Sequence, residues 1–353
     1  MIALSEVLEN IRPVDNAVRR RARTRQRTLT KPPGSLGRLE DIAVQLAGIF
    51  GAERPQVRGK AVIIAAGDHG VVSQGVSSYP QEVTAQMVHN MLAEGAAISV
   101  LCRQLGVRRV IMNAGVAAAL PASPELRSLR AGRGTADISQ GPAMTQEQAR
   151  RCLDAGIDLA MEAANADADL IGAGDMGIGN TTSASAIVAT LTGRSPRDTT
   201  GAGAGRNKEE LAHKVAVVTQ ALAVNSPDPE EPLAVLAKVG GFEIGVLAGV
   251  VLGGALMRRA VVLDGFISGA AALVACALAP AARDYLIASH RSAEAGHRFV
   301  LTRLKLRPLL DLRLRLGEGT GAVLAMPVIE SAARCLTEMA TFAEAGVSDR
   351  TVV

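Results

Sequence analysis

The stretch ADLIGAGDMGIGNTTSASA, residues 168–186, does most to decide the fold of this chain. It opens with a nearly continuous apolar run, places four glycines within eight residues, and then reads Asn-Thr-Thr-Ser, which is typical of a helix N-terminus. An apolar run of this kind suits a strand covered on both faces, as in a parallel sheet. The stretch therefore predicts a strand, a glycine-rich turn and a helix in succession.

The same succession recurs along the chain. Apolar runs that lead into glycine-rich or polar turns occupy residues 61–70, 109–116, 260–269 and 285–297. Helix-length segments lie between them, and we expect one helix over 82–106 and another over 267–278. Strands that alternate with helices predict an α/β fold. We therefore expect a large domain, residues 51–321, whose parallel sheet is flanked by helices in a Rossmann-like arrangement.

The two ends of the chain have a different pattern. Residues 1–50 are predicted to be helical, with a turn at KPPGSLG (31–37). Over residues 320–345 the apolar side chains recur at helical spacing, at Leu324, Val328, Leu336, Met339 and Phe342. We expect residues 1–50 and 322–353 to pack together as a small helical domain built from both termini.

The composition excludes several classes of protein. None of the 353 residues is Trp and only 2% are aromatic, which argues against a protein that stacks nucleic-acid bases. The content of hydrophobic residues, 48%, argues against a disordered chain. The longest apolar run, Ile244–Met257, is shorter than the about 20 residues that a membrane span needs. We therefore expect it to form a buried element, and we expect no membrane span.

Charge and cysteine usage indicate the environment of the protein. Six arginines lie between residues 19 and 27, and we interpret them as the solvated face of a helix rather than as an anion or nucleic-acid patch. The four cysteines lie far apart in the sequence and do not have the spacing of zinc ligands or redox pairs. We expect a cytoplasmic protein without a metal or a cofactor.

The polar turns that follow the apolar runs are expected to meet. In parallel α/β sheets, ligands bind outside the carboxyl ends of the strands, and these turns all fall there. The pattern predicts one neighbourhood that contains Asp68, His69, Asp175, Asn180, Asp264, His290 and Glu318. For His69 itself we favour a structural role, because the five histidines show no metal-ligand spacing.

Three of these motifs indicate chemistry. The helix start after residue 179 offers free backbone amides, so a phosphate can bind there, although an ordinary capped turn has the same residues. Lys214 follows TTGAGAGRN (199–207) and is either a phosphate partner or a solvated lysine. Glu318 lies between glycines in LGEGTG (316–321), as a general base or as an acid that stabilises a helix start. The residues alone thus indicate an α/β enzyme for a phosphorylated small molecule.

Several motifs together resemble one family over nearly the whole chain. They include KPPGSLGRLE (31–40), GVSSYPQEVTAQMV (75–88), MGIGNTTSA (176–184), SHRSAEAGH (289–297) and RPLLDLRLRLGEGTGAVLAMP (307–327). In this order they are similar to the nicotinate-nucleotide–dimethylbenzimidazole phosphoribosyltransferase, or CobT, family. The resemblance implies that ribose 5-phosphate moves from nicotinate mononucleotide to 5,6-dimethylbenzimidazole in cobalamin synthesis, in a homodimer.

The resemblance also implies roles for individual residues. The catalytic base falls on Glu318, and a second acid falls on Asp175, where the family often has Glu. The residues implied for phosphate and ribose are Gly177, Gly179, Asn180, Thr181, Gly203, Lys214, Asp264 and Ser292. Those implied for the base are Ser78, Tyr79, Gln86, Met176 and Leu316.

Two alternatives stay open beside this assignment. One is the same transfer to a different lower-ligand base, such as adenine, another benzimidazole or a phenol. The other is a non-catalytic paralogue that binds the nucleotide, because Ala202 and Ala204 stand where many family members have Arg and Thr. The presence of Glu318 and Lys214 argues against the second alternative.

Overall fold

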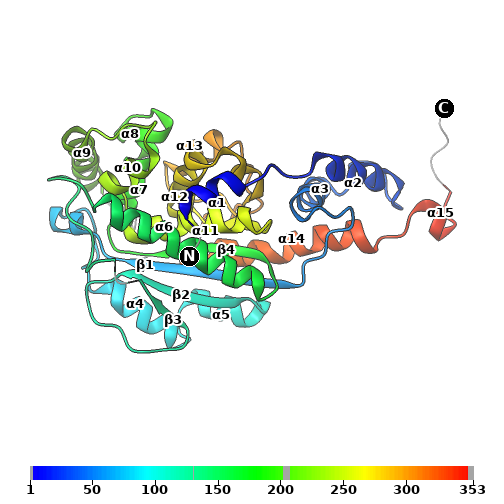
Figure 1. The fold of residues 1–353 in the computed structure, drawn as a ribbon, viewed down its shortest axis with the longest axis horizontal. Helices are drawn as coiled ribbons and strands as arrows, with labels where there is room; N and C mark the ends of the chain where they lie inside the picture. Colours follow the sequence, from blue (N-terminus) through cyan, green and yellow to red (C-terminus); the bar gives the residue numbers. More distant parts are fainter. Residues whose placement is uncertain (1–2, 130, 202–206, 349–353) are drawn as a thin grey trace.

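A computed structural model describes residues 3–129, 131–201 and 207–348. Its centre is a sheet of six parallel strands in the order β3-β2-β1-β4-β5-β6. Figure 1 labels the first four strands of this order. The strands are β1 (Gly59–Gly67), β2 (Arg108–Gly115), β3 (Leu126–Ser128), β4 (Ala168–Met176), β5 (Ala260–Leu263) and β6 (Leu286–Ala288). The predicted parallel α/β fold is confirmed. The five expected strands are present, and the short β3 adds a sixth.

Helices surround the sheet. Those in the first half of the chain are α1 (Leu4–Asn10), α2 (Asn16–Thr28), α3 (Arg38–Phe50), α4 (Val83–Leu92), α5 (Ala97–Leu105) and α6 (Gln146–Asn165), with the 3-10 helix η1 (Gly70–Gln74). Those that follow are α7 (Asn180–Thr192), α8 (Pro196–Thr199), α9 (Lys208–Asn225), α10 (Pro232–Val239), α11 (Phe242–Leu256), α12 (Phe266–Leu278), η2 (Pro280–Tyr285), α13 (His297–Arg303), α14 (Thr320–Glu338) and α15 (Phe342–Ala345).

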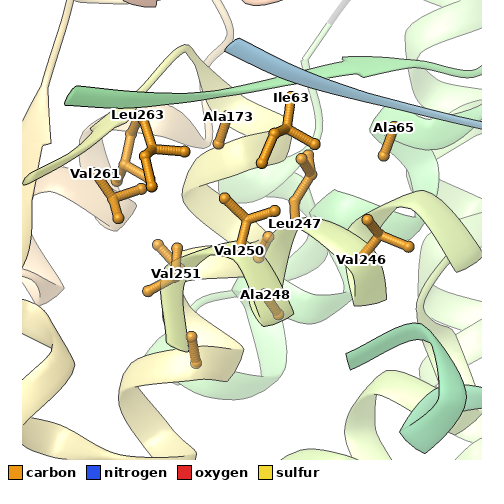
Figure 2. Packing of buried hydrophobic residues seen from close by; sticks show 14 of the residues in the cluster. Ile63, Ala65, Ala173, Val246, Leu247, Ala248, Val250, Val251, Val261 and Leu263 are labelled. Carbon is orange, nitrogen blue, oxygen red and sulfur yellow. The ribbon is translucent and has the colours of Figure 1, made fainter. Parts of the chain in front are cut away.

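Helix α11 is the central helix of the core, as expected for the apolar run over residues 244–257. It contacts β1, β2, β4 and β5 on one side and α6 and α12 on others. Figure 2 shows Leu247 and Val250 of α11 among Ile63, Ala173 and Leu263 of the strands. All of these side chains are buried. No helix within the described residues is both long enough and apolar enough to cross a bilayer.

Small residues allow the two helices α6 and α11 to approach backbone to backbone. A Cβ placed on Gly156 of α6 would lie 1.9 Å from the carbonyl oxygen of Val246. On α11, a Cβ on Gly249 would lie 2.1 Å from the carbonyl oxygen of Leu153. Glycine is required at both positions because any side chain would force the helices apart.

The expectation of one helix over residues 82–106 was wrong, because the segment is broken between α4 and α5. Glu94 takes the left-handed conformation, with φ of 63°. The amide of Gly95 donates to the carbonyl of Asn90, which closes the end of α4. Left-handed residues stop a right-handed helix, so α5 starts afresh at Ala97.

The two ends of the chain lie side by side in space. Helix α14 contacts α3 and α2 at the right of Figure 1, and Leu29 pairs with Thr341 in an antiparallel bridge. Arg25 is buried and donates to the carbonyls of Leu336 and Met339, at 2.9 and 3.2 Å. Helix α1 instead contacts α11. The proposed limits of the small domain, 1–50 with 322–353, stay a prediction that these terminal contacts support.

Two details of these terminal helices refine the sequence patterns. In α14, Leu324 and Val328 are half-buried, whereas Val323, Met326 and Ile329 face the core. In α2, Arg20, Arg21, Arg23 and Arg27 are exposed, in keeping with a solvated face, but Arg25 is not.

Candidate functional site

The candidate site lies where the strand order reverses. β1 and β4 are neighbours, but the chain leaves them toward opposite edges of the sheet, and such a point opens a crevice at the carboxyl ends of the strands. A cavity of about 70 Å³ opens there, between the turns that follow β4, β5 and β6. Its lining includes Asp175, Asn180, Thr181, Asp264, His290 and Ser292. The cavity thus brings together most of the polar turn residues expected from the sequence.

Glu318 lies in an unusual backbone conformation beside this cavity. Gly317, Glu318 and Gly319 have φ of 84°, 63° and 84°, three left-handed residues in a row. This conformation costs about 1–2 kcal/mol for a residue with a side chain. The carboxyl group is buried, and its Oε2 atom has no hydrogen-bond partner among the described residues. Burial raises the pKa of Glu318, and the Ile98 amide at the start of α5 opposes that rise.

Asp264 and Asp175 hold the loop that carries Glu318. Asp264 accepts hydrogen bonds from the amides of Gly319, Gly321 and Ala322, at 3.1, 2.7 and 3.2 Å, and so caps α14. The backbone amide of Glu318 donates to the carbonyl of Asp175 at 3.0 Å. The conformation of the loop is therefore fixed from both β4 and β5.

These acids are crowded and buried, which changes their ionisation. Burial raises the pKa of Asp264 to about 7, against the opposing effect of the three amides. Burial, followed by the nearby carboxyl groups of Asp264 and Glu243, raises the pKa of Asp175 well above its usual value. The Asp175 carboxylate accepts from the side-chain amide of Asn180 at 2.9 Å. Protons are therefore held readily at this site.

The start of α7 is open for an anion. We expected Thr or Ser to cap it, but the residue before the helix is Gly179, with φ of 91°, and no side chain of the described residues caps it. Lys214 is almost fully buried, not solvated, and its Nζ donates to the Thr181 hydroxyl at 2.7 Å. The helix dipole and a buried ammonium together favour a phosphate group.

The five residues proposed for the base fall into two groups. Met176 ends β4 and is buried, and Leu316 lines the cavity with 57% of its surface exposed. Ser78, Tyr79 and Gln86 lie exposed around the start of α4. This helix contacts the site through Thr84, whose hydroxyl accepts from the amide of Ile178 at 3.1 Å.

Two site residues escaped the sequence reasoning. Glu294 is largely buried in the cavity lining, and burial raises its pKa, while Lys214 and Arg315 oppose the rise. Glu243, at the start of α11, lies 2.7 Å from Nε2 of His69. Glu294 stands in SHRSAEAGH (289–297), one of the motifs that carry the family resemblance, and Glu243 stands in GGFEIG (240–245), but the spacing of these acids along the chain gives no sign of a partner.

The comparisons with known proteins agree with the resemblance. A family model described as "Phosphoribosyltransferase" matches residues 11–347. A nicotinate-nucleotide–dimethylbenzimidazole phosphoribosyltransferase from Roseiflexus sp. (strain RS-1) is 57% identical over 350 residues, which cover 99% of each chain. The chain belongs to this phosphoribosyltransferase family. A relative of the same name from Geobacter metallireducens is 50% identical and covers 98% of each chain.

Solved structures of this family have the same fold. The crystal structure of nicotinate-nucleotide–dimethylbenzimidazole phosphoribosyltransferase from Thermus thermophilus superposes with a TM-score of 0.91 at 49% identity, over 95% of this chain and 100% of that one. Gly203, with Ala202 and Ala204, lies outside the described residues. The roles assigned to single residues stay predictions within a confirmed family. Within the described part of the chain, no cluster of His, Cys, Asp and Glu is arranged to hold a metal ion.

Proposed function

We propose that this protein transfers the ribose 5-phosphate of nicotinate mononucleotide to 5,6-dimethylbenzimidazole and so forms α-ribazole 5′-phosphate and nicotinate. This is the reaction that the names of its relatives describe. The observation that carries the mechanism is the buried Glu318 carboxyl, with a free Oε2 atom, on a left-handed loop at the crevice. Strained backbone conformations of this kind cluster at active sites and ligand-binding sites.

Nicotinate leaves from a pyridinium ring and is therefore already an activated leaving group. What the protein must supply is a proton acceptor. The bond between C1′ and the pyridinium nitrogen breaks, and its electron pair neutralises the nicotinate ring. One nitrogen of the benzimidazole forms the new bond to C1′ from the opposite face, so the anomeric centre inverts. The N–H on the other ring nitrogen becomes acidic and passes its proton to the Glu318 carboxylate. A base positioned in this way accelerates a reaction about 10²–10⁴-fold.

The remaining residues position the nucleotide. We assign the phosphate to the start of α7 and Lys214, because Asn180 and Thr181 line the cavity and the Lys214 ammonium donates to the Thr181 hydroxyl. Asp264 fixes the loop of Glu318, and Ser292 is a further residue of the cavity lining. Holding the two reactants together contributes several kcal/mol to the barrier reduction.

An activity assay with a single variant tests this proposal. The protein is incubated with nicotinate mononucleotide and dimethylbenzimidazole, and α-ribazole phosphate is measured by chromatography. We expect Glu318→Gln to lower kcat by about 10²–10⁴-fold with an unchanged fold. Glu338→Gln, the same change at an exposed position of α14, is the control and should retain full activity. Normal turnover of Glu318→Gln would remove this residue from the mechanism.

A different acceptor base is the second candidate function. The chain has no Trp, and Tyr79, the aromatic residue proposed for the base, is 52% exposed. A slot formed mainly by aliphatic groups selects weakly between flat rings, because it offers few polar contacts. Competition between dimethylbenzimidazole, adenine and a phenol in one reaction identifies the preferred acceptor.

The paralogue, the homodimer and the cytoplasmic location are further proposals. A non-catalytic paralogue would bind nicotinate mononucleotide tightly without turnover, and the same assay with a binding measurement separates the two. A homodimer is expected from the family resemblance, and light scattering of the purified protein tests it. Fractionation of cells that express the protein tests its location.

A further inference from the structure

A contact made one turn after the helix begins holds the start of α7 in position. A helix N-terminus is normally fixed by a side chain that caps it, but among the described residues α7 has no such cap. The amides of Asn180 and Thr182 donate to the carbonyls of Gly177 and Gly179, at 3.2 and 3.0 Å, so contacts with other elements hold this turn in place. Ser183, in the second turn of α7, is fully buried, and its hydroxyl lies 3.1 Å from Nδ1 of His69.

His69 also contacts a third element, helix α11. Its other ring nitrogen, Nε2, lies 2.7 Å from Oε1 of Glu243, at the start of α11. All three side chains are fully buried. In the tautomer with hydrogen on Nε2, this nitrogen donates to the carboxylate, and Nδ1 accepts a hydrogen bond from the Ser183 hydroxyl. His69 follows β1 directly, so this chain of hydrogen bonds joins β1, α7 and α11.

Glycines make room for the chain of hydrogen bonds. A Cβ on Gly241 would lie 2.5 Å from Cε1 of His69, and one on Gly67 would lie 2.9 Å from Oε2 of Glu243. Gly179, which precedes α7, lies near the base of the His69 side chain, since its added Cβ would be 3.3 Å from the Cβ of His69. The imidazole is thus enclosed by backbone, and small shifts of α7 would break its contacts.

We propose that Ser183, His69 and Glu243 position the amides of α7 for the phosphate of the nucleotide, with His69 as the central positioning residue. This inference rests on the proposed function for the identity of the ligand. None of the three side chains lines the cavity, so they act through the helix and not on the substrate. Loss of the contact between Ser183 and His69 would let the start of α7 shift and would weaken nucleotide binding.

Three variants separate positioning from stability. Ser183→Ala removes the contact at α7. His69→Gln places an amide at the distance of Nε2 and keeps the contact with Glu243, but loses that with Ser183. His69→Asn places an amide at the distance of Nδ1 and keeps the contact with Ser183, but loses that with Glu243. Thr190→Val is the control, because this hydroxyl donates only within α7, to the carbonyl of Ala186.

The measurements are the Kd for nicotinate mononucleotide by calorimetry, KM for both substrates, and Tm. We expect Ser183→Ala and His69→Gln to raise Kd and KM for the nucleotide about tenfold, with KM for dimethylbenzimidazole unchanged. His69→Asn should lower Tm most, since it leaves Glu243 unpaired, and should bind the nucleotide nearly as the unmodified protein does. Thr190→Val should match the unmodified protein in all three.

The outcomes distinguish this inference from the proposed function. If Ser183→Ala binds the nucleotide as tightly as the unmodified protein, or changes only Tm, the positioning role is overturned. If the unmodified protein forms no α-ribazole phosphate but Ser183→Ala still weakens nucleotide binding, the proposed function fails and the positioning role stands. An unmodified protein that binds neither nicotinate mononucleotide nor inorganic phosphate overturns both.

Discussion

Glu318 combines a strained backbone with an incompletely satisfied side chain. A carboxyl group in water would find partners for both oxygens, and a residue with a side chain rarely takes φ of 63°. Here the two flanking glycines carry the rest of the turn, and the cap by Asp264 fixes its position. The result is a buried carboxyl group whose Oε2 atom has no hydrogen-bond partner in the described part of the chain.

The ionisation of Glu318 predicts the acidic side of the pH–rate profile. The base must be deprotonated to act, and burial raises its pKa above the usual 4.5. We therefore expect kcat/KM to fall, as the pH is lowered, with a midpoint above 4.5. The profile from pH 4 to 8 measures it. Glu318→Gln should be slow at every pH, and its kcat/KM should not show this fall at low pH. If the variant shows the same fall, the titrating group is not Glu318.

Lys214 is the residue whose removal should affect the phosphate most directly. A buried charge-assisted hydrogen bond to a ligand is worth more than a neutral one. Lys214→Met keeps the bulk of the buried side chain and removes the ammonium, so we expect KM for nicotinate mononucleotide to rise about 10–100-fold. KM for dimethylbenzimidazole should not change. Lys208→Met, on the exposed first turn of the same helix, is the control, and an equal effect there would contradict the assignment.

At the scale of elements, the sequence predicts strands better than helix ends. Five strands follow from apolar runs, because a strand covered on both faces is apolar throughout. The break between α4 and α5 was missed, since the apolar spacing continues through Glu94 and only its left-handed backbone ends the helix. The mostly exposed strand β3 has only three residues, too few for a pattern.

The sequence also predicts only some of the residues of the candidate site. Glu318, Asp175 and Lys214 could be predicted because their motifs match a family. The contact between Glu243 and His69 spans 174 residues of sequence, and no local pattern reports a partner at that distance. The helix start at residue 180 was predicted as a possible phosphate site, but the sequence did not indicate that Thr181 and Ser183 bond Lys214 and His69.

The close contact between α6 and α11 predicts a sharp difference between two glycines. Gly249→Ala would place a methyl group 2.1 Å from the carbonyl oxygen of Leu153, so the helices must separate. We expect the free energy of unfolding to fall by about 1–3 kcal/mol. Gly141→Ala meets nothing within 4 Å and is the control. Urea denaturation of both variants compares them, and equal stability would show that the helices can separate without cost.

For the whole molecule, the buried acids make stability depend on pH. Asp264 has an ordinary value of 3.8 and a pKa of about 7 in the folded protein, so the folded state holds the proton that the unfolded state releases. Between these values the free energy of unfolding therefore falls as the pH rises, and the fall ends above about pH 7. The pKa values of Asp175 and Glu294 shift in the same direction.

Denaturation at several pH values between 4 and 8 measures this dependence. We expect Asp264→Asn to make the decline with rising pH shallower, although the loss of cap hydrogen bonds lowers its stability overall. Asp158→Asn, at an exposed position of α6, should keep the full slope. A slope in Asp264→Asn as steep as in the unmodified protein would assign the dependence to the other acids.

The hydrogen bond from Arg25 to the carbonyl of Leu336 sets an order of events during synthesis on the ribosome, because the two residues are 311 positions apart. At about 5–20 residues per second, roughly 15–60 s pass between their additions to the nascent chain. Throughout that time the apolar surfaces of α2 and α3 lack the helix that covers them. These two helices can therefore complete their packing only after α14 has been synthesised.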